Sequence, residues 1–527
     1  MNKFIYRALP LVAMVFATTS CSDFLEQSIV GQESLDTYFY TEDECTKAVT
    51  GCYQAVMYDD WWQVSKFMIV AEMATDDAWC GNTNQDQGEY YDLAHYTGST
   101  ITDVATEFWQ YRYKGILRTN VVIDRVPTAE YVDADLRARL VAEAKFLRAF
   151  FYFDLVKNFG GMPLVYDLLM PTDVVGITRA TEAETYALIE QDLIDAAEVL
   201  PLKSEYSSSD TGRATKGAAQ AYLAKVYLYQ EKYSEAKGVL ESLISSGEYK
   251  LMDFFGDVWS TSYHNNDESI FEDQNSSVTE YALGSLLPVV TGSRDDSGWA
   301  WCQPTSDLEN LYLAEGDDVR LAYTIIKDGT TTIPGDDAIT TAYSISSSSH
   351  KSGRIIHKYY IPTDVRPSPY STGNHNPLNF RLMRYAEVLL MYAEVCNELG
   401  DDATAKTYLN MIRTRAGLSS VSSISTELRD AIRKERRMEL AFEYNRLYDI
   451  RRWNDDSGSP LIASIMGSNG SFVNYNLNES TDEYEVSNQI ENSNKGVNFR
   501  ADRDLLFPIP NSEITLSDGS ITQNPNF

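Results

Sequence analysis

The sequence predicts a mainly α-helical fold in which helix hairpins pack against a loop-rich, irregular half. Three observations predict this fold: long stretches with apolar residues at helical spacing, an internal repeat of a helical hairpin, and long segments in which that spacing fades. Of the 527 residues, 43% are hydrophobic and 12% are aromatic, which is ample for a packed core. The chain is therefore expected to fold rather than to be disordered.

Amphipathic helices are expected in the first half of the chain and again after residue 380. Two Thr-x-x-Glu capping boxes, at Thr41 and Thr181, open helical stretches. The helix over residues 136–158 should end at Gly160 and Gly161, because glycine commonly terminates helices and Pro163 follows. The other predicted helices span residues 106–126, 183–199, 216–230, 234–246, 382–399, 402–415 and 427–449.

An internal repeat emerges when residues 224–240 are laid without gaps over residues 393–409. Both segments have the pattern helix, short turn, helix, with small residues where the two helices would approach each other. This pattern is typical of a tetratricopeptide-like hairpin, whose stacked copies bury a continuous core. The matching pairs are Ala224 with Ala393, Val226 with Val395, Ala236 with Ala405, Lys237 with Lys406 and Leu240 with Leu409.

Helical periodicity fades between the two copies of the repeat, where Gly, Pro, Ser, Asn and aromatic residues increase. Long irregular segments inside a folded chain are usually functional loops. We therefore expect a single body over residues 21–527. Its helical scaffold spans about 36–250 and 378–453, ligand-binding loops span about 75–100 and 250–377, and an irregular C-terminal segment spans 454–527.

The first twenty residues are predicted to be a lipoprotein signal peptide. Lys3 and Arg7 form a basic region, and the apolar stretch over 8–17 is far shorter than the roughly 20 residues that span a bilayer. The sequence TTSC at 18–21 resembles a bacterial lipobox, in which Cys21 becomes the acylated first residue. The alternative is ordinary cleavage beside a chance cysteine. The lipobox interpretation predicts a soluble body tethered to a membrane by lipid.

The net charge restricts the possible partners. The chain has 44 Lys and Arg against 77 Asp and Glu, a formal charge of −33, and removal of the signal peptide with Lys3 and Arg7 makes it −33 − 2 = −35. Nucleic-acid binding is excluded as a general function, because phosphate contacts need clustered Lys and Arg. Electrostatic attachment to anionic lipid is disfavoured for the same reason. The charge favours a neutral ligand over a polyanion.

Catalytic signatures are absent from the sequence. There is no G-x-S-x-G, H-E-x-x-H, P-loop or dinucleotide-binding motif, and the five histidines lack metal-ligand spacing. Glycoside hydrolysis needs a pair of carboxylates, but so acidic a chain offers such pairs in every loop, so their presence does not indicate this activity. Asp295-Asp296 and Asp317-Asp318 leave calcium open as an alternative, although they lack an EF-hand pattern. We predict a binding protein, not an enzyme, without catalytic residues, metal or cofactor.

Several motifs in order along the chain point to one family. They are CSDFLE at 21–26, EAKFLRAFFYF at 143–153 with FGGMPLV at 159–165, GRATKGAA at 212–219, RYAEVLLMYAE at 384–394, IRKERRMEL at 432–440 with RRW at 451–453, LFPIP at 506–510 and QNP at 523–525. Together they resemble the SusD/RagB family of outer-membrane nutrient-binding lipoproteins, and the resemblance spans almost the whole chain.

The resemblance implies four tetratricopeptide-like hairpins and a lipid-anchored protein on the cell-surface side of the outer membrane. Such a protein sits as a lid on a SusC-like TonB-dependent transporter and captures nutrients, usually an oligosaccharide or polysaccharide. The alternative is capture of a non-glycan nutrient such as peptides by the same lid mechanism. The charged motif residues Arg436, Glu439, Arg451 and Arg452 are expected to form internal salt bridges rather than to bind ligand.

Two loops carry the residue types that sugar binding needs, which are aromatic planes for C–H faces and side chains that form paired hydrogen bonds. These loops cover residues 76–82 and 281–303, and Trp61 with Trp62 form a third candidate. Core packing is the alternative for each Trp. The predicted site is a platform of Trp79, Tyr281 and Trp301, flanked by Trp299, with Asp77, Asn82 and Arg294 as polar contacts.

Cys80 and Cys302 lie in these two loops, each directly after a tryptophan. If the loops converge, the two thiols could approach disulfide distance, and passage through the periplasm would permit the bond. Buried free thiols are the alternative. The odd number of cysteines after Cys21 argues against a disulfide framework.

Overall fold

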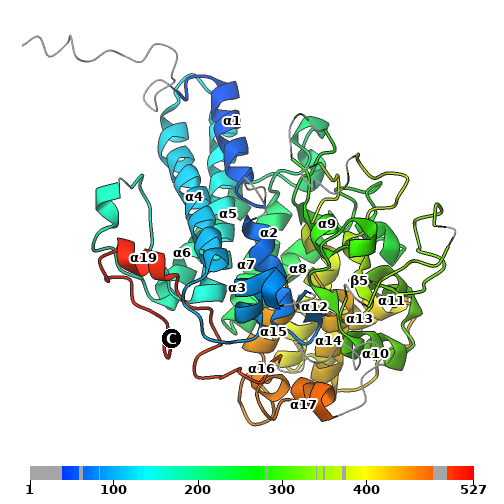
Figure 1. Ribbon diagram of the computed structural model, residues 1–527. Helices are drawn as coiled ribbons and strands as arrows, with labels where there is room; N and C mark the ends of the chain where they lie inside the picture. Colours follow the sequence, from blue (N-terminus) through cyan, green and yellow to red (C-terminus); the bar gives the residue numbers. More distant parts are fainter. Residues whose placement is uncertain are drawn as a thin grey trace, which may run out of the picture.

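The structure of the protein is a computed structural model, shown in Figure 1. It describes residues 38–57, 63–81, 84–169, 171–278, 280, 283–339, 341–347, 350–368, 370, 375–478 and 495–527. Several predictions lie outside these residues: the signal peptide, the lipidated Cys21, Trp61, Trp62, Asn82 and Tyr281.

A layer of helices forms the scaffold. Its first part contains α1 (Glu42–Tyr53), α2 (Gln63–Met73), α4 (Asp103–Arg125), α5 (Ala134–Phe159), α6 (Glu182–Val199), α7 (Lys216–Tyr229) and α8 (Tyr233–Ser245). Its second part contains α12 (Tyr385–Glu398), α13 (Asp402–Arg415), α14 (Ser425–Glu439) and α15 (Arg446–Arg452). Successive helices from α4 to α8 pack on one another, and α12 packs on both α8 and α13, so the two predicted repeat hairpins are neighbours in space.

The mainly helical prediction is confirmed, and most helix boundaries agree within three residues. Both capping boxes form, with the Thr41 and Thr181 side chains accepting from the third helical backbone N–H and Glu44 and Glu184 accepting in return. Helix α5 ends at Gly160, whose φ of 79° suits glycine. A Cβ on Gly161 would lie 2.1 Å from the Ala180 carbonyl oxygen, so the chain can pass there only as glycine.

The prediction of a single helix over residues 427–449 is wrong. Helix α14 ends at Glu439, and α15 begins only at Arg446. The turn that follows contains Phe442 and Tyr444, both with φ of 62°, a conformation that side chains other than glycine seldom adopt. Contacts from distant segments stabilise the turn. The Tyr444 N–H donates to Glu72 Oε1 at 2.6 Å, and Glu443 pairs with Lys358 at 2.6 Å. Tertiary contacts thus override the local helical pattern.

Short two-stranded ladders and helices make up the irregular half. Within the described residues the ladders are antiparallel: β1 (Ala78–Trp79) with β3 (Gln303–Pro304), β2 (Ser269–Glu272) with β6 (Arg381–Arg384), and β4 (Ile325–Lys327) with β5 (Arg354–Ile356). Further α-helices in the described part of the chain are α3 (Asn84–Ala94), α9 (Leu287–Thr291), α10 (Ser306–Glu315), α11 (Asp318–Thr324), α16 (Leu461–Ile465), α17 (Ser471–Asn478) and α19 (Asn511–Leu516). Short 3₁₀ turns are η2 (Val126–Thr128), η3 (Pro171–Val174), η4 (Lys203–Glu205), η5 (Ser208–Asp210), η6 (Phe255–Trp259), η7 (Arg294–Asp296) and η8 (His357–Tyr359).

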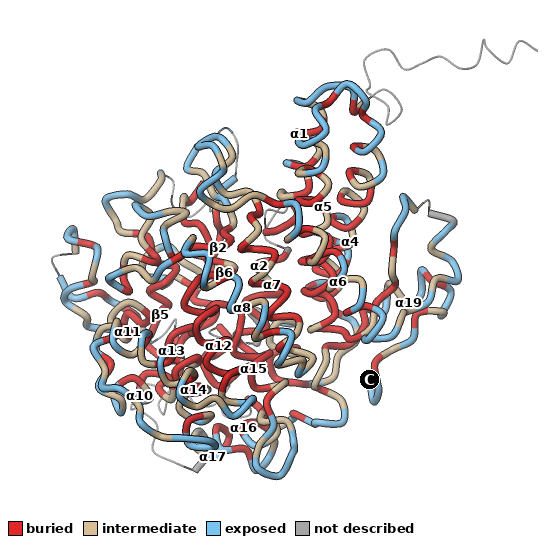
Figure 2. The backbone as a smooth tube through the Cα atoms, turned by 180° about the vertical axis from the view of Figure 1, so that it is seen from behind, coloured by how far each residue is buried: buried red, intermediate tan, exposed pale blue. Residues whose placement is uncertain are grey.

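The hydrophobic core runs through α5, α7, α12 and α15, which Figure 2 shows as mainly buried, whereas the outer loops are exposed. Aromatic side chains dominate its centre. Phe67 stacks on Phe108 with ring centroids 4.1 Å apart, and Phe146 meets Phe271 edge-on at 5.1 Å. The contact between Phe146 on α5 and Phe271 on β2 joins the helical layer to the irregular half, so both share one core.

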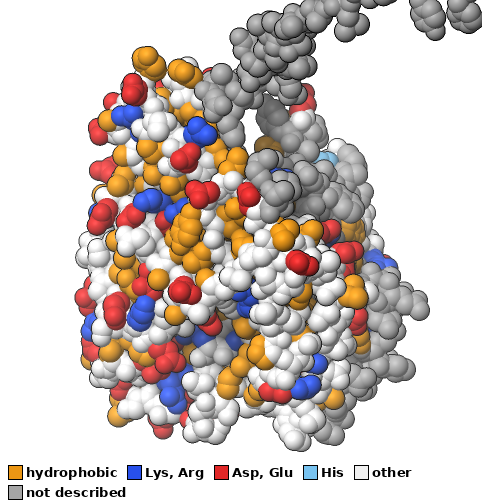
Figure 3. All heavy atoms as spheres, turned by 90° about the vertical axis from the view of Figure 1, so that its left-hand side faces the viewer, with side chains coloured by type: hydrophobic (Ala, Val, Ile, Leu, Met, Phe, Trp, Pro, Cys, Tyr) orange, Lys and Arg blue, Asp and Glu red, His pale blue; other side chains and the backbone are white. Residues whose placement is uncertain are grey.

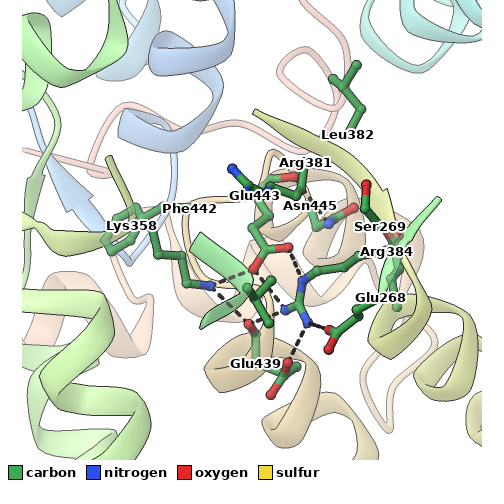
Figure 4. Close-up of polar contacts among 12 residues, drawn as sticks. Glu268, Ser269, Lys358, Arg381, Leu382, Arg384, Glu439, Phe442, Glu443 and Asn445 are labelled. Atoms are coloured by element: carbon green, nitrogen blue, oxygen red, sulfur yellow. Dashed lines mark hydrogen bonds and ion pairs between the residues drawn. The ribbon is translucent and has the colours of Figure 1, made fainter. Parts of the chain in front are cut away.

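An ion-pair network is buried where the helical layer meets the irregular half (Figure 4). Arg384 pairs with Glu268 and Glu439 at 2.6 Å each and with Glu443 at 2.7 Å. Burial opposes its charge, but these carboxylates hold the pKa of Arg384 well above its usual value. Arg415 pairs with Glu268 at 2.7 Å and also with Glu439. Part of the acidic composition therefore neutralises internal arginines.

The family-motif arginines are mostly internal, as the sequence predicted. Arg436 pairs with Asp449 at 3.0 Å, and Arg452 pairs with Glu394 at 2.5 Å. Arg451 differs: among the described residues it forms no ion pair, and it donates to the Asp504 carbonyl at 3.0 Å while lying over the Phe507 ring.

The surface charge is mixed on the face shown in Figure 3, where acidic, basic and apolar side chains are interspersed. The net negative charge is therefore not gathered into one patch on that face. Within the part of the chain that the structure describes, no helix combines the length and apolarity that crossing a membrane requires.

Candidate functional site

The ladder of β1 and β3 brings together the two loops that the sequence singled out. Trp79 lies opposite Gln303, and Ala78 lies opposite Pro304. Thr305 strengthens the contact, because its N–H donates to the Asp77 carbonyl at 3.0 Å and its hydroxyl donates to the Asp76 carbonyl at 2.8 Å. Segments more than 220 residues apart in sequence thus form one site.

The segment that carries Trp299 and Trp301 is fixed on the end of α9. Trp299 N–H donates to Val289 O at 2.8 Å, and Trp301 N–H donates to Val290 O at 2.9 Å. The backbone at Gly298 passes so close to Gly292 that a Cβ on residue 298 would lie 2.3 Å from the Gly292 backbone. These contacts fix the backbone that carries the two indoles, which lowers the entropy cost of binding a ligand.

Three aromatic rings form a cluster at this site, which we call the aromatic platform: Tyr90, Trp299 and Trp301. The Trp299 and Trp301 ring centroids lie 5.9 Å apart at 63°, and Tyr90 on α3 lies 4.8 Å from Trp301. Trp301 is 9% exposed, whereas Trp299 and Tyr90 are half-buried. Rings that are held by the core on one side and accessible on the other suit the C–H faces of a sugar.

Trp79 lies beneath the surface rather than on it, at 3% exposure. Its ring meets Phe472 at 5.5 Å, and the Lys495 ammonium lies 5.2 Å from the ring centroid. Lys495 also donates to the Ala78 carbonyl, and burial lowers the pKa of its ammonium to about 8. The Trp79 side chain therefore anchors strand β1 on the C-terminal segment.

Asp77 is also fully buried and belongs to an ion-pair cluster. Arg437 lies between carboxylates, at 2.7 Å from Asp77, 2.6 Å from Asp307 and 3.1 Å from Asp76. Asp76 pairs in addition with Arg446 at 2.7 Å. This cluster ties the β1 loop to α10, α14 and α15, so Asp77 holds the site together and its carboxylate does not face solvent.

Arg294 is exposed at the edge of the platform, on η7. Its Nε donates to the Trp299 carbonyl at 3.3 Å, which ties the guanidinium to the backbone of the Trp299 segment. The neighbouring Asp296 is paired with Arg366 at 2.6 Å and accepts from Tyr343 at 3.0 Å. Of the predicted site residues, the structure thus brings Trp299, Trp301 and Arg294 together near the surface.

Sequence reasoning missed Tyr90, Phe472 and Lys495. Tyr90 lies inside the predicted ligand-binding loop at about 75–100, but the search for sugar-binding rings within it singled out only the tryptophan. Phe472 and Lys495 come from the irregular C-terminal segment, about 400 residues after Trp79. Nothing local in the sequence signals their contact with β1.

The cysteines in the two loops, Cys80 and Cys302, are buried free thiols in this structure. Burial raises the pKa of Cys80 to about 12, so the thiol stays protonated at neutral pH. Among the described residues, no group of three His, Cys, Asp or Glu side chains has the arrangement that a metal ion requires.

His95 directly follows α3 and is stacked on the Tyr91 ring, and its titration provides a test of this packing. Burial, reinforced by the Lys495 charge, lowers the pKa of His95 to about 3, whereas an unfolded histidine has a pKa near 6.5. The unfolded state therefore binds the extra proton, so the stabilisation that His95 gives is present above about pH 6.5 and is lost as the pH falls towards 3.

The variant His95→Gln cannot take up this proton. We expect the difference in free energy of unfolding between wild type and variant to shrink by up to about 1.4 kcal/mol per pH unit below pH 6.5. Urea denaturation in matched buffers between pH 7.5 and about 4.5 measures this difference. A difference that stays constant over this range would contradict the buried, neutral state of His95.

Comparison with known proteins places these features in context. A protein-family model described as "SusD family" matches residues 258–527, and one described as "Starch-binding associating with outer membrane" matches residues 23–228. SusD-like protein P2 of Formosa agariphila is 26% identical over 541 residues, a match that covers 98% of this chain and 99% of that protein.

Solved structures show the same architecture. A SusD-like protein of Bacteroides fragilis is similar with a TM-score of 0.74 at 25% identity, covering 93% of this chain and 98% of that one. A structure described as a laminarin-binding SusD-like protein has a TM-score of 0.73 at 25% identity, covering 92% of this chain and 99% of that one.

Proposed function

The chain belongs to the SusD family, whose members are non-catalytic binding proteins, and on this premise we propose that it captures a neutral oligosaccharide or polysaccharide at the cell surface. The ligand is then delivered to a SusC-like TonB-dependent transporter in the outer membrane. A lipid on Cys21 tethers the protein there. The observation that carries this proposal is the aromatic platform of Tyr90, Trp299 and Trp301.

The geometry of the platform supports a glycan. The half-buried rings of Tyr90 and Trp299, with Trp301 packed beside them, offer apolar faces that match the C–H faces of a sugar ring. Arg294 beside Trp299 supplies hydrogen-bond donors at the edge. In this proposal Tyr281 and Asn82 complete the ligand surface, and Trp79 and Asp77 act as supports underneath it.

The ligand is proposed to be neutral. A mature charge of −33 − 2 = −35 disfavours a polyanionic chain, although charges beyond a Debye length of about 8 Å are screened. The similar laminarin-binding protein gives a starting point, since laminarin is an uncharged glucan. Laminarin is therefore the first candidate in a panel rather than an assigned ligand.

Affinity electrophoresis tests the proposal directly. The full chain is run through native gels that contain laminarin, other neutral polysaccharides or acidic polysaccharides, beside a non-binding reference protein. We expect retardation by at least one neutral polysaccharide and none by the acidic ones. Retardation only by acidic polysaccharides would overturn the neutral assignment. No retardation by any glycan, together with peptide binding in calorimetry, would overturn glycan capture.

A further inference from the structure

A cavity lies between the end of α1, the turn after η5, and strand β2. Its volume is about 460 Å³, within the range of about 300–1,000 Å³ that small-molecule sites occupy. None of the described platform residues lines it. The cavity is open to solvent on one side, where Leu283 lies at its rim with 37% exposure.

The floor of this cavity is apolar and partly aromatic. Tyr53 and Phe271 lie side by side with ring centroids 6.5 Å apart, and Val56 completes the floor. The Tyr53 hydroxyl points away into the scaffold, because it donates to Glu143 at 2.8 Å and accepts from the Ala214 N–H at 2.8 Å. The cavity therefore meets the ring of Tyr53 and not its polar end.

Two of the charged side chains in the wall, Arg213 and Glu272, are paired with partners outside the cavity. Arg213 pairs with Glu143 and with Asp210, at 3.0 Å each. Glu272 pairs with Arg381 at 3.3 Å. These pairs leave the cavity without a free cation for an anionic ligand.

Two polar groups in the wall keep hydrogen-bonding capacity. Asp273 Oδ2 accepts from Asn275 at 2.7 Å, and Oδ1 accepts no hydrogen bond from the described residues. Gln54 Oε1 accepts from Arg118 at 3.1 Å, and its amide nitrogen donates to none of the described residues. The lining of the cavity thus includes an acceptor and a donor with unused hydrogen-bonding capacity, beside an aromatic floor.

We propose that this cavity is a second binding site, for one or two units of a neutral sugar. A pyranose ring would lay its C–H face on Tyr53 and Phe271, and its hydroxyls would donate to Asp273 and accept from Gln54. An anion would meet the Asp273 carboxylate without a balancing cation. None of the described platform residues lines this site, so it is tested separately from the function proposed above.

Gly51 on α1 offers a clean way to close the cavity. It lines the space, and a Cβ at this position meets no atom within 4 Å. The variant Gly51→Phe should therefore fill the cavity without a clash at the backbone. Gly238 on α8 is the matched control, since a Cβ there also meets nothing within 4 Å and the residue does not line the cavity.

Saturation-transfer difference NMR measures binding at this site, with glucose, galactose, mannose, xylose, cellobiose and laminaribiose as probes at about 10 mM, which would fill a site with a Kd of about 1 mM. The platform variant Trp299→Ala is the background, so that only the second site is observed. We expect signals for at least one probe in this background and in its combination with Gly238→Phe. Addition of Gly51→Phe should weaken binding at least tenfold.

Other results would overturn the second site. One such result is the absence of signal from every probe, both in wild type and in the Trp299→Ala background. Another is equal signals with and without Gly51→Phe. If Gly51→Phe fails to fold, Asp273→Ala with Gln54→Ala replaces it, because these changes remove the polar contacts without adding volume. Undiminished binding in that double variant would also overturn the proposal.

Discussion

Replacing Arg384 by Met is expected to lower the free energy of unfolding by about 3–5 kcal/mol. Arg384 is 1% exposed and stands between Glu268, Glu439 and Glu443, which lie within 2.7 Å of its guanidinium. Met fills a similar volume but removes the positive charge. Three carboxylates would then share the remaining cations, Arg320, Arg415 and Lys358, and the uncompensated charge would be buried.

Urea denaturation followed by tryptophan fluorescence measures this loss, provided that wild type and variant give the same slope against urea. The control is Lys250→Met, which removes one cation from an exposed pair with Asp267 that contributes little. We expect no measurable change for this control. A loss below about 1 kcal/mol for Arg384→Met would mean that the network is not a stabilising element of the fold.

The helical layer could be predicted from the sequence because its signals are local. The Thr41 and Thr181 capping boxes, the apolar spacing of α5 and the glycines that end it each act within a few residues. The repeat also could be predicted, since α7 with α8 and α12 with α13 are hairpins that carry their own small residues at the contact. Local chemistry of this kind needs no knowledge of distant segments.

The break after Glu439 could not be predicted in this way. Its positive-φ residues Phe442 and Tyr444 are not glycines, so composition gives no sign of a turn. The turn exists because Glu72 and Lys358, each distant in sequence, bond to it. Where partners more than 80 residues away decide the backbone, helical periodicity alone gives the wrong answer.

The candidate site falls between these two cases. Enrichment in Trp and polar residues singled out the two loops, and the ladder of β1 and β3 joins them. Which indole faces solvent could not be predicted from the sequence. Trp79 is covered by Phe472 and Lys495 from the far end of the chain, whereas Trp299 keeps one side accessible. Exposure is a property of the whole fold, not of the motif.

The acidic composition also has two sources that the sequence could not separate. Some carboxylates, such as Glu439 and Asp76, are buried partners of arginines. Although burial opposes its charge, Arg415, Arg384 and Arg320 hold the pKa of Glu439 well below its usual value. Others, such as Asp43 and Asp502, are exposed. Only the exposed group acts on a ligand, so the charge argument for a neutral glycan depends on fewer residues than the total suggests.

Replacing Trp299 by Ala is expected to weaken binding of the captured glycan about 30-fold or more, which corresponds to about 2 kcal/mol for loss of a central aromatic contact. Trp299 is half-buried and is positioned through its backbone by Val289, so removal of the indole should leave the loop in place. Isothermal titration with the polysaccharide identified by electrophoresis measures the affinity. Unchanged affinity would mean that the ligand binds somewhere other than the platform.

The matched variant is Trp79→Ala, because the two tryptophans lie in joined loops but differ in exposure. Trp79 is 3% exposed and packs on Phe472, so its loss should cost about 3–5 kcal/mol of folding free energy through the cavity it leaves. Trp299→Ala should cost much less stability and more affinity. If instead Trp79→Ala folds with wild-type stability and loses binding, the ligand reaches the inner indole and the platform must open to admit it. The pair of variants therefore separates a ring that contacts the sugar from one that supports the site.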